Sequence, residues 1–292
     1  MKQLIYLVIS LFLLISCSGK PGNGNKRDVP VITVTIEPLR YFTEAIAGDH
    51  FNVVSMVPKG SSPETYDPTP QQLVSLGKSD AYLRIGHIGF EATWMDKLSA
   101  NAPGMKIFDT SQGVDLIRDK GHSHGDHYHE GGIDPHIWNS TVNARIITRN
   151  ILHALIALDK ENETYYTARY DSLQREIQLT DSIIRGILSV DADTSFMIYH
   201  PALSYFAHEY DLHQIPIEKG GKEPSPAYLK ELIDLCKHNG VHTIFVQPEF
   251  DVRNAEMIAE ETGTKIVRVN PLAYDWQEEM INTAKALKAE NR

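Results

Sequence analysis

The sequence ETYYTARYDSLQREIQLTDSIIRGIL, residues 163–188, predicts one long amphipathic helix near the middle of the chain. Apolar or aromatic residues recur along it with a period of about 3.5 to 3.6 residues. They are Tyr166, Tyr170, Leu173, Ile177, Ile184 and Leu188. An uninterrupted helix of this length would span about 39 Å. A free coiled-coil stalk is the weaker interpretation, because the stripe covers only about three heptads and strand-like segments flank it. We therefore expect a rigid brace, preceded by a second helix over 142–158.

Short β-rich segments alternate with helical patterns on both sides of this brace. Before it they occupy 31–36, 51–57, 81–86 and 106–110, and after it 196–200, 213–218, 243–247 and 265–270. Such alternation implies parallel sheets with right-handed crossovers. The predicted fold is therefore α/β, with two four-stranded parallel-sheet lobes joined by a long rigid helix. We place the first lobe at 30–141, the linking helices at 142–189 and the second lobe at 190–292.

The first residues of the chain predict export and a lipid anchor. Lys2 precedes an apolar run from Leu4 to Ile15, which is shorter than the about 20 residues of a spanning helix and suits a signal peptide over 1–16. The sequence LISC resembles the bacterial lipobox, in which the cysteine, here Cys17, is acylated. An uncleaved anchor is the alternative. Residues 17–29 then form a flexible tether, and we expect the protein in the cell envelope, attached to the outside of a membrane.

The composition of the chain excludes a disulfide, allows two hydrophobic cores and argues against one class of partner. With Cys17 assigned to lipid, Cys236 is the only other cysteine, so no intramolecular disulfide can form. A hydrophobic content of 42% is enough for sizeable cores in two lobes. The formal net charge of −10 argues against nucleic acid as a partner.

Candidate metal ligands follow several of the predicted strands. In open α/β sheets, ligands bind beyond the carboxyl ends of the strands. Glu64 lies in a proline-rich loop after the second strand, His136 in DPHIW after the fourth, and His200 at the end of the fifth. The last strand ends at Asn270, and Asp275 follows shortly after it. Imidazole and carboxylate are donors that a borderline divalent ion prefers, so these positions together predict a metal site in a cleft between the lobes.

The segment 121–132 is unusually rich in histidine. It contains His122, His124, His127 and His129, flanked by glycines. Imidazoles at this spacing are typical of an accessory, low-affinity trap for zinc, nickel or copper. A merely solvated polar loop is the alternative.

Taken together, these motifs resemble the zinc-uptake solute-binding proteins of the ZnuA and TroA type (cluster A-I metal-binding lipoproteins). The resemblance covers nearly all of the mature chain. It is carried by GSSPETYDPTPQQL, IGHIGFEATW, the His-rich loop, DPHIW, HPALSYFAHEY, EPSPAYLKELI and AEMIAEETGTKIV leading to NPL. The resemblance implies two α/β lobes joined by one rigid helix, with His136 and His200 as metal ligands. It also implies an ABC permease with its ATPase as partner, and we expect a monomer.

Two positions depart from the family pattern. Glu64 stands where most members have a histidine, and Asn270 where many have an aspartate. A carboxylate at Glu64 can still ligate zinc, at about 2.0 to 2.2 Å. Asp275 could supply a fourth ligand, but a helix N-cap or a first-turn acid is an equal interpretation. His87, where the family commonly has asparagine, is a further weak candidate.

Zinc is the expected metal and manganese the alternative. The oxygen ligand Glu64 favours manganese relative to an all-imidazole site. Manganese members of the family, however, generally carry a carboxylate at the position of His200 and lack the His-rich loop. A metal-dependent hydrolase would use a similar site, but no HExxH pair or nucleophile elbow accompanies it, and we expect Glu249 to support the C-terminal lobe. We therefore expect no enzymatic activity. An adhesin of the same fold is a further alternative.

Overall fold

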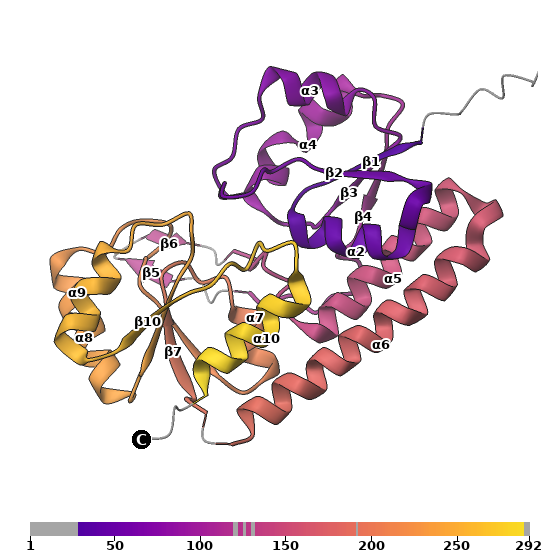
Figure 1. Ribbon diagram of the computed structural model, residues 1–292. Coiled ribbons are helices and arrows are strands. Elements are labelled where there is room, and N and C mark those ends of the chain that lie inside the picture. The colour runs from indigo at the N-terminus through magenta and orange to yellow at the C-terminus, as the bar shows by residue number, and fades with distance from the viewer. Residues whose placement is uncertain (1–28, 119–121, 125–126, 130–131, 191, 289–292) are drawn as a thin grey trace, which may run out of the picture.

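The computed structural model describes residues 29–118, 122–124, 127–129, 132–190 and 192–288. The signal peptide, Cys17 and most of the tether lie outside these residues. Two four-stranded sheets form separate lobes, and two long helices run alongside them (Figure 1). No helix in the described ranges is long and apolar enough to cross a bilayer.

The N-terminal lobe is built on a parallel sheet with the strand order β2-β1-β3-β4. Its strands are β1 (Val31–Val34), β2 (Asn52–Ser55), β3 (Ala81–Arg84) and β4 (Lys106–Asp109), and its helices are α2 (Glu37–Ala47), α3 (Pro70–Leu76) and α4 (Gly89–Asn101). The central strands are buried on both faces, as parallel sheets covered by helices are. Ile32, Val34 and Leu83 are fully buried on one face, and Tyr82 is fully buried on the other.

The C-terminal lobe repeats this plan with the order β10-β9-β7-β8, again all parallel. Its strands are β7 (Ser195–Ile198), β8 (His213–Pro216), β9 (Thr243–Val246) and β10 (Lys265–Arg268), and its helices are α7 (Ser204–Glu209), α8 (Pro226–His238), α9 (Arg253–Thr262) and α10 (Trp276–Leu287). All eight strands lie within or at the edges of the segments predicted from sequence, which confirms the predicted fold class.

Two helices join the lobes. They are α5 (Thr141–Leu158) and α6 (Glu163–Leu188), and α6 contacts α5, α2 of the first lobe and α10 of the second (Figure 1). The predicted stripe faces the core, because Tyr166, Leu173, Ile177 and Ile184 are all buried. The helix is therefore a brace that both lobes share.

A pair of tryptophans fixes the junction between the lobes. The indole Nε1 of Trp138 donates to the Pro271 carbonyl oxygen at 2.7 Å, and that of Trp276 donates to the Trp138 carbonyl oxygen at 2.8 Å. Phe42 of α2 contacts the Trp276 ring edge-on, with centroids 5.1 Å apart. Residues of both lobes belong to one continuous hydrophobic core. The lobes are consequently packed together, and not merely tethered.

The His-rich segment contributes two short antiparallel strands, β5 (His122–His124) and β6 (His127–His129). Their register pairs His122 with His129 and His124 with His127.

Candidate metal site

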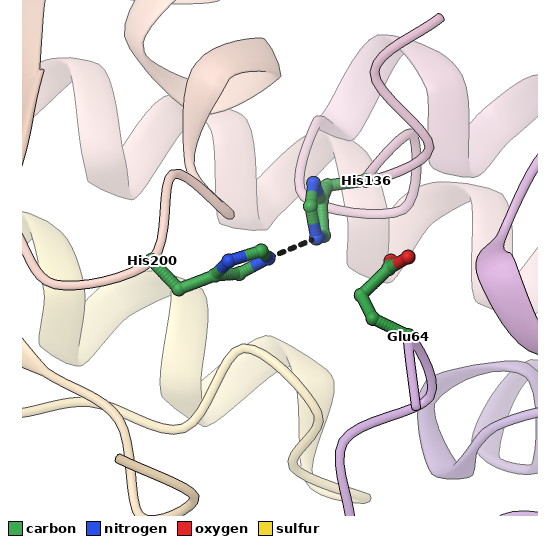
Figure 2. Close-up of side chains that lie close together, drawn as sticks. All are labelled: Glu64, His136 and His200. Atoms are coloured by element: carbon green, nitrogen blue, oxygen red, sulfur yellow. Dashed lines mark hydrogen bonds between the residues drawn. The ribbon is translucent and has the colours of Figure 1, made fainter. Parts of the chain in front are cut away.

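Glu64, His136 and His200 form one cluster in which the potential ligand atoms all lie within 4.8 Å of one another. They come from three distant parts of the chain. Glu64 lies in the loop between β2 and α3, His136 in the segment leading into α5, and His200 just after β7. Figure 2 shows the two imidazoles facing each other, with the Glu64 carboxylate close to the His136 ring. No other group of three or more His, Cys, Asp or Glu side chains within the described ranges is arranged to hold a metal.

Glu64 leaves one carboxylate oxygen free for a ligand. Its Oε2 accepts a hydrogen bond from the backbone N–H of Gly89 at 3.2 Å, and its own N–H donates to Ser62 Oγ at 3.3 Å. Its Oε1 is buried and has no hydrogen-bond partner. An unpaired buried acceptor is costly, by about 1 to 3 kcal/mol, so such an atom is well suited to a cation.

His136 is oriented by Asp134, two residues before it. Asp134 Oδ1 accepts hydrogen bonds from the backbone N–H and from Nδ1 of His136, each at 2.9 Å. Burial alone would raise the pKa of Asp134, but the hydrogen bond and charge of His136, with further help from Ser204, hold it below its ordinary value. The carboxylate therefore stays ionised and fixes the imidazole with Nε2 facing the cluster.

His200 is oriented in the same way from the other lobe. Its Nδ1 lies 2.8 Å from Oε1 of Glu218, whose side chain is only 7% exposed. The side chain of Gln247 accepts from the His200 N–H and donates to the His200 carbonyl oxygen. The ring of Phe250 stacks on the imidazole at 5.3 Å and 15°. The ring position of His200 is thus determined from several sides.

The two Nε2 atoms lie 3.2 Å apart. With each Nδ1–H donated to a carboxylate, Nε2 is the lone-pair nitrogen of both rings. Two lone pairs repel at this distance unless a proton or a metal cation lies between them. Two nitrogen ligands of a tetrahedral zinc ion, each about 2.05 Å from the metal, would be about 3.3 Å apart. The geometry of the pair therefore fits a shared metal ion.

A small cavity of about 30 Å³ adjoins the cluster. Much of its wall is apolar, namely Pro63, Trp138, Ala202, Phe250, Pro271 and Leu272. About 10 to 15 Å³ of such space is enough for one water molecule. The cavity therefore has room for an ion and a further small donor.

The three weaker ligand candidates, Asn270, Asp275 and His87, do not line the cavity beside the cluster. Asn270 and Asp275 line a neighbouring cavity of about 190 Å³ and not the one beside the cluster. The Asn270 side-chain oxygen accepts from the Leu272 N–H at 3.1 Å. Asp275 occupies the N-cap position of α10, although its side chain makes no capping hydrogen bond. His87 is exposed, has a positive φ of 60° and lines neither cavity.

The two carboxylates that hydrogen-bond the imidazoles, Asp134 and Glu218, were not among the residues singled out from sequence. The sequence contains a feature that could have identified each of them. Asp134 opens the DPHIW motif two residues before the histidine, and Glu218 ends the predicted strand 213–218 at the edge of the sheet where ligands gather. The structure places the backbone of the accessory histidines, His122, His124, His127 and His129, in the β5–β6 pair. Their role in metal binding stays a prediction, as does acylation of Cys17.

Comparison with known proteins gives consistent matches. A family profile described as "Zinc-uptake complex component A periplasmic" (ZnuA) matches residues 32–290. The high-affinity zinc uptake system protein ZnuA of Bacillus subtilis (strain 168) is 28% identical over 281 residues, covering 92% of this chain and 88% of that protein. The iron ABC transporter substrate-binding lipoprotein MtsA of Streptococcus pyogenes serotype M1 is 27% identical over 276 residues, covering 91% and 87%. A zinc-bound deletion mutant of ZnuA matches in structure with a TM-score of 0.82 at 36% identity, covering 90% of this chain and all of that one.

Proposed function

Because the chain belongs to the zinc-uptake complex component A (ZnuA) family, whose profile spans residues 32–290, we propose that it is the solute-binding component of an ABC metal importer. It captures Zn²⁺ outside the cytoplasm and delivers the ion to the permease. The metal is cargo and not a catalytic cofactor, and the protein is not an enzyme. Anchoring through acylated Cys17 and a monomeric state belong to the same proposal.

The main support for this proposal is that three potential ligand atoms without hydrogen-bond donors lie close together. They are the unpaired Oε1 of Glu64 and the facing Nε2 atoms of His136 and His200. Each imidazole donates its Nδ1–H to a carboxylate behind it, and metal-binding histidines almost always donate this N–H to a carboxylate, a carbonyl or a water molecule. Three protein ligands with room for a fourth small donor suit an ion that must be released again.

The donor set favours zinc over manganese. Two imidazole nitrogens and one carboxylate oxygen form a mixed site of the kind zinc binds, whereas manganese prefers mainly oxygen ligands. Iron(II) is the second candidate, because a relative of similar identity, MtsA, is described as an iron transporter component. The same ligand types also serve iron, so a measurement has to decide between the two metals.

Competitive metal titration tests the proposal. The chain from Asp28 to Arg292, stripped with chelator, is titrated with zinc, iron(II) and manganese against a chromophoric chelator. The variants are His136→Ala, a deletion of 121–132, and His153→Ala as a matched control on an exposed face of α5. We expect the wild type to prefer zinc. His136→Ala should lose more than the roughly 10- to 100-fold that changes to groups behind a ligand cause.

The outcome separates the alternatives. Affinity that depends on His136 and survives both the loop deletion and His153→Ala supports a cleft site with an accessory loop. If iron or manganese binds in preference to zinc, that metal is the cargo and zinc is not. If all affinity disappears with residues 121–132, the cluster is not the transport site. A deletion strain that still grows normally under zinc starvation would argue against import.

A further inference from the structure

The cluster supplies three ligand atoms, but a zinc ion in a protein is usually four-coordinate. The fourth donor must come from the lining of the 30 Å³ cavity or from water. The apolar side chains of the lining offer no atom that could ligate a metal. Several backbone carbonyls there are already hydrogen-bonded, namely those of Pro63, Trp138, Ala202 and Pro271.

Three further polar residues line the cavity, and two of them have other partners. The hydroxyl of Ser62 accepts from the backbone N–H of Glu64. The amide of Gln247 is occupied at both ends by the His200 backbone. The third is Glu249, to which no other described residue donates a hydrogen bond and with which none forms an ion pair. By exclusion, Glu249 is the one lining carboxylate left for a ligand.

The position of Glu249 supports this role. It lies between Gln247, which holds the His200 backbone, and Phe250, which stacks on the His200 ring. Burial raises the pKa of Glu249 above its ordinary value, against a smaller lowering by its own backbone N–H and by the charge of His200. A half-buried carboxylate without a cationic partner is poorly stabilised, and a divalent ion beside it would remove that penalty.

We propose that Glu249 is the fourth ligand and completes the metal site from the C-terminal lobe, in addition to Glu64, His136 and His200. This rests on the proposed function. Glu249 is not part of the 4.8 Å cluster, so its side chain must rotate toward the ion when the ion binds. Each lobe then contributes a carboxylate.

The test compares Glu249→Gln with the wild type and with Glu260→Gln, a matched control at an exposed position of α9. Glutamine keeps the size of the side chain and removes its charge. Zinc affinity is measured by chelator competition, and coordination by the visible absorption of the Co²⁺ complex and by zinc K-edge absorption. We expect Glu249→Gln to weaken zinc binding by more than the roughly 10- to 100-fold that changes to groups behind a ligand cause. It should also change the Co²⁺ spectrum and leave the circular dichroism spectrum unchanged. Glu260→Gln should match the wild type.

Each outcome is decisive. An unchanged affinity and spectrum in Glu249→Gln overturn the inference and leave water as the fourth ligand. A weaker affinity with an unchanged Co²⁺ spectrum also overturns it, because Glu249 would then act only through its charge. A wild type that holds no transition metal, or one whose binding does not need His136, refutes the proposed function itself, and the inference falls with it.

Discussion

The Nε2 atoms of His136 and His200 lie 3.2 Å apart, although the two histidines are separated by 64 positions and are positioned by different lobes. Each ring is fixed from behind by a buried or largely buried carboxylate, Asp134 or Glu218. The short separation is therefore built into the fold and does not depend on two flexible side chains meeting by chance.

The orienting carboxylates should matter for affinity as well as for ring position. We expect Asp134→Asn and Glu218→Gln each to weaken zinc binding by about 10- to 100-fold, because each loses the charge that holds its imidazole and raises the basicity of Nε2. Chelator competition measures the effect, and circular dichroism checks the fold. Asp96→Asn, at an exposed position of α4, is the control. Affinities equal to that of the wild type would show that the hydrogen bonds at Nδ1 contribute nothing to binding.

Gly89→Ala should displace Glu64. A Cβ atom at this position would lie 2.7 Å from both the carbonyl oxygen and Oε2 of Glu64, which is closer than real contacts allow. Alanine is otherwise favourable at a helical position, so the steric conflict determines the result. We expect zinc affinity to fall at least about 10-fold and the free energy of unfolding to fall by about 1 to 3 kcal/mol. Isothermal titration and urea unfolding measure the two quantities.

Gly104→Ala provides the control, because no atom lies within 4 Å of a Cβ built there. It should leave affinity unchanged. If Gly89→Ala also binds zinc normally, the position of Glu64 is not important for the site.

Glu91 should make stability depend on pH. Burial raises the pKa of this carboxyl to about 7, although hydrogen bonds from Thr35 and from the backbone N–H groups of Ile85 and Gly86 lower it. Between about pH 4.5 and 7 the folded state keeps a proton that the unfolded state has released, so stability falls as pH rises. The loss approaches about 3 kcal/mol above pH 7.

Urea unfolding in chelator across pH 4.5 to 8 tests this, with Glu91→Gln as the comparison. The difference in the free energy of unfolding, wild type minus Glu91→Gln, should fall by a few kcal/mol as pH rises through this window. The other ionisable groups are common to both proteins and cancel in the difference. A difference that stays constant with pH would mean that Glu91 is ionised in the folded protein throughout the range.

Trp276→Phe should weaken the junction between the lobes. The change removes the indole N–H that donates to the Trp138 carbonyl oxygen. Because Trp276 is only 2% exposed, the smaller ring also leaves a cavity in the core. We expect a loss of about 1 to 3 kcal/mol in the free energy of unfolding. Trp94→Phe loses a hydrogen bond to Asp67 at a partly buried position away from the junction and should change stability by about 1 kcal/mol at most. Equal effects of the two variants would contradict a structural role for the tryptophan pair.

The fold was predictable because its signals are local. The helical period over 163–188 gave the limits of α6, and the β-rich runs gave all eight strands of the two lobes. The three clustered ligand candidates could also be named, because each is a metal-binding residue type placed beyond a strand. Position after a strand did not distinguish these three from Asn270 and Asp275. Those two residues also follow a strand, but they line a neighbouring cavity.

The orienting contacts depend on information that a single sequence does not contain. The pairing of His200 with Glu218 requires β8 to lie beside β7 in one particular register, with Ile198 opposite Pro216. Similarly, the hydrogen bond from Gly89 to Glu64 joins the start of α4 to a loop residue 25 positions earlier. Side-chain contacts of this kind follow from the packed arrangement of neighbouring loops and strands, which periodicity does not specify.

The loop that carries Glu64 has a consequence for how metal preference can evolve. Glu64 lies in a partly exposed connection between β2 and α3, whereas His136 and His200 adjoin the tightly packed junction of the lobes. A substitution at position 64 therefore alters the donor set without repacking the core, while a change at either histidine alters residues that the junction surrounds. Position 64 is therefore the place in this chain where one ligand can be exchanged for another while the junction of the lobes stays intact.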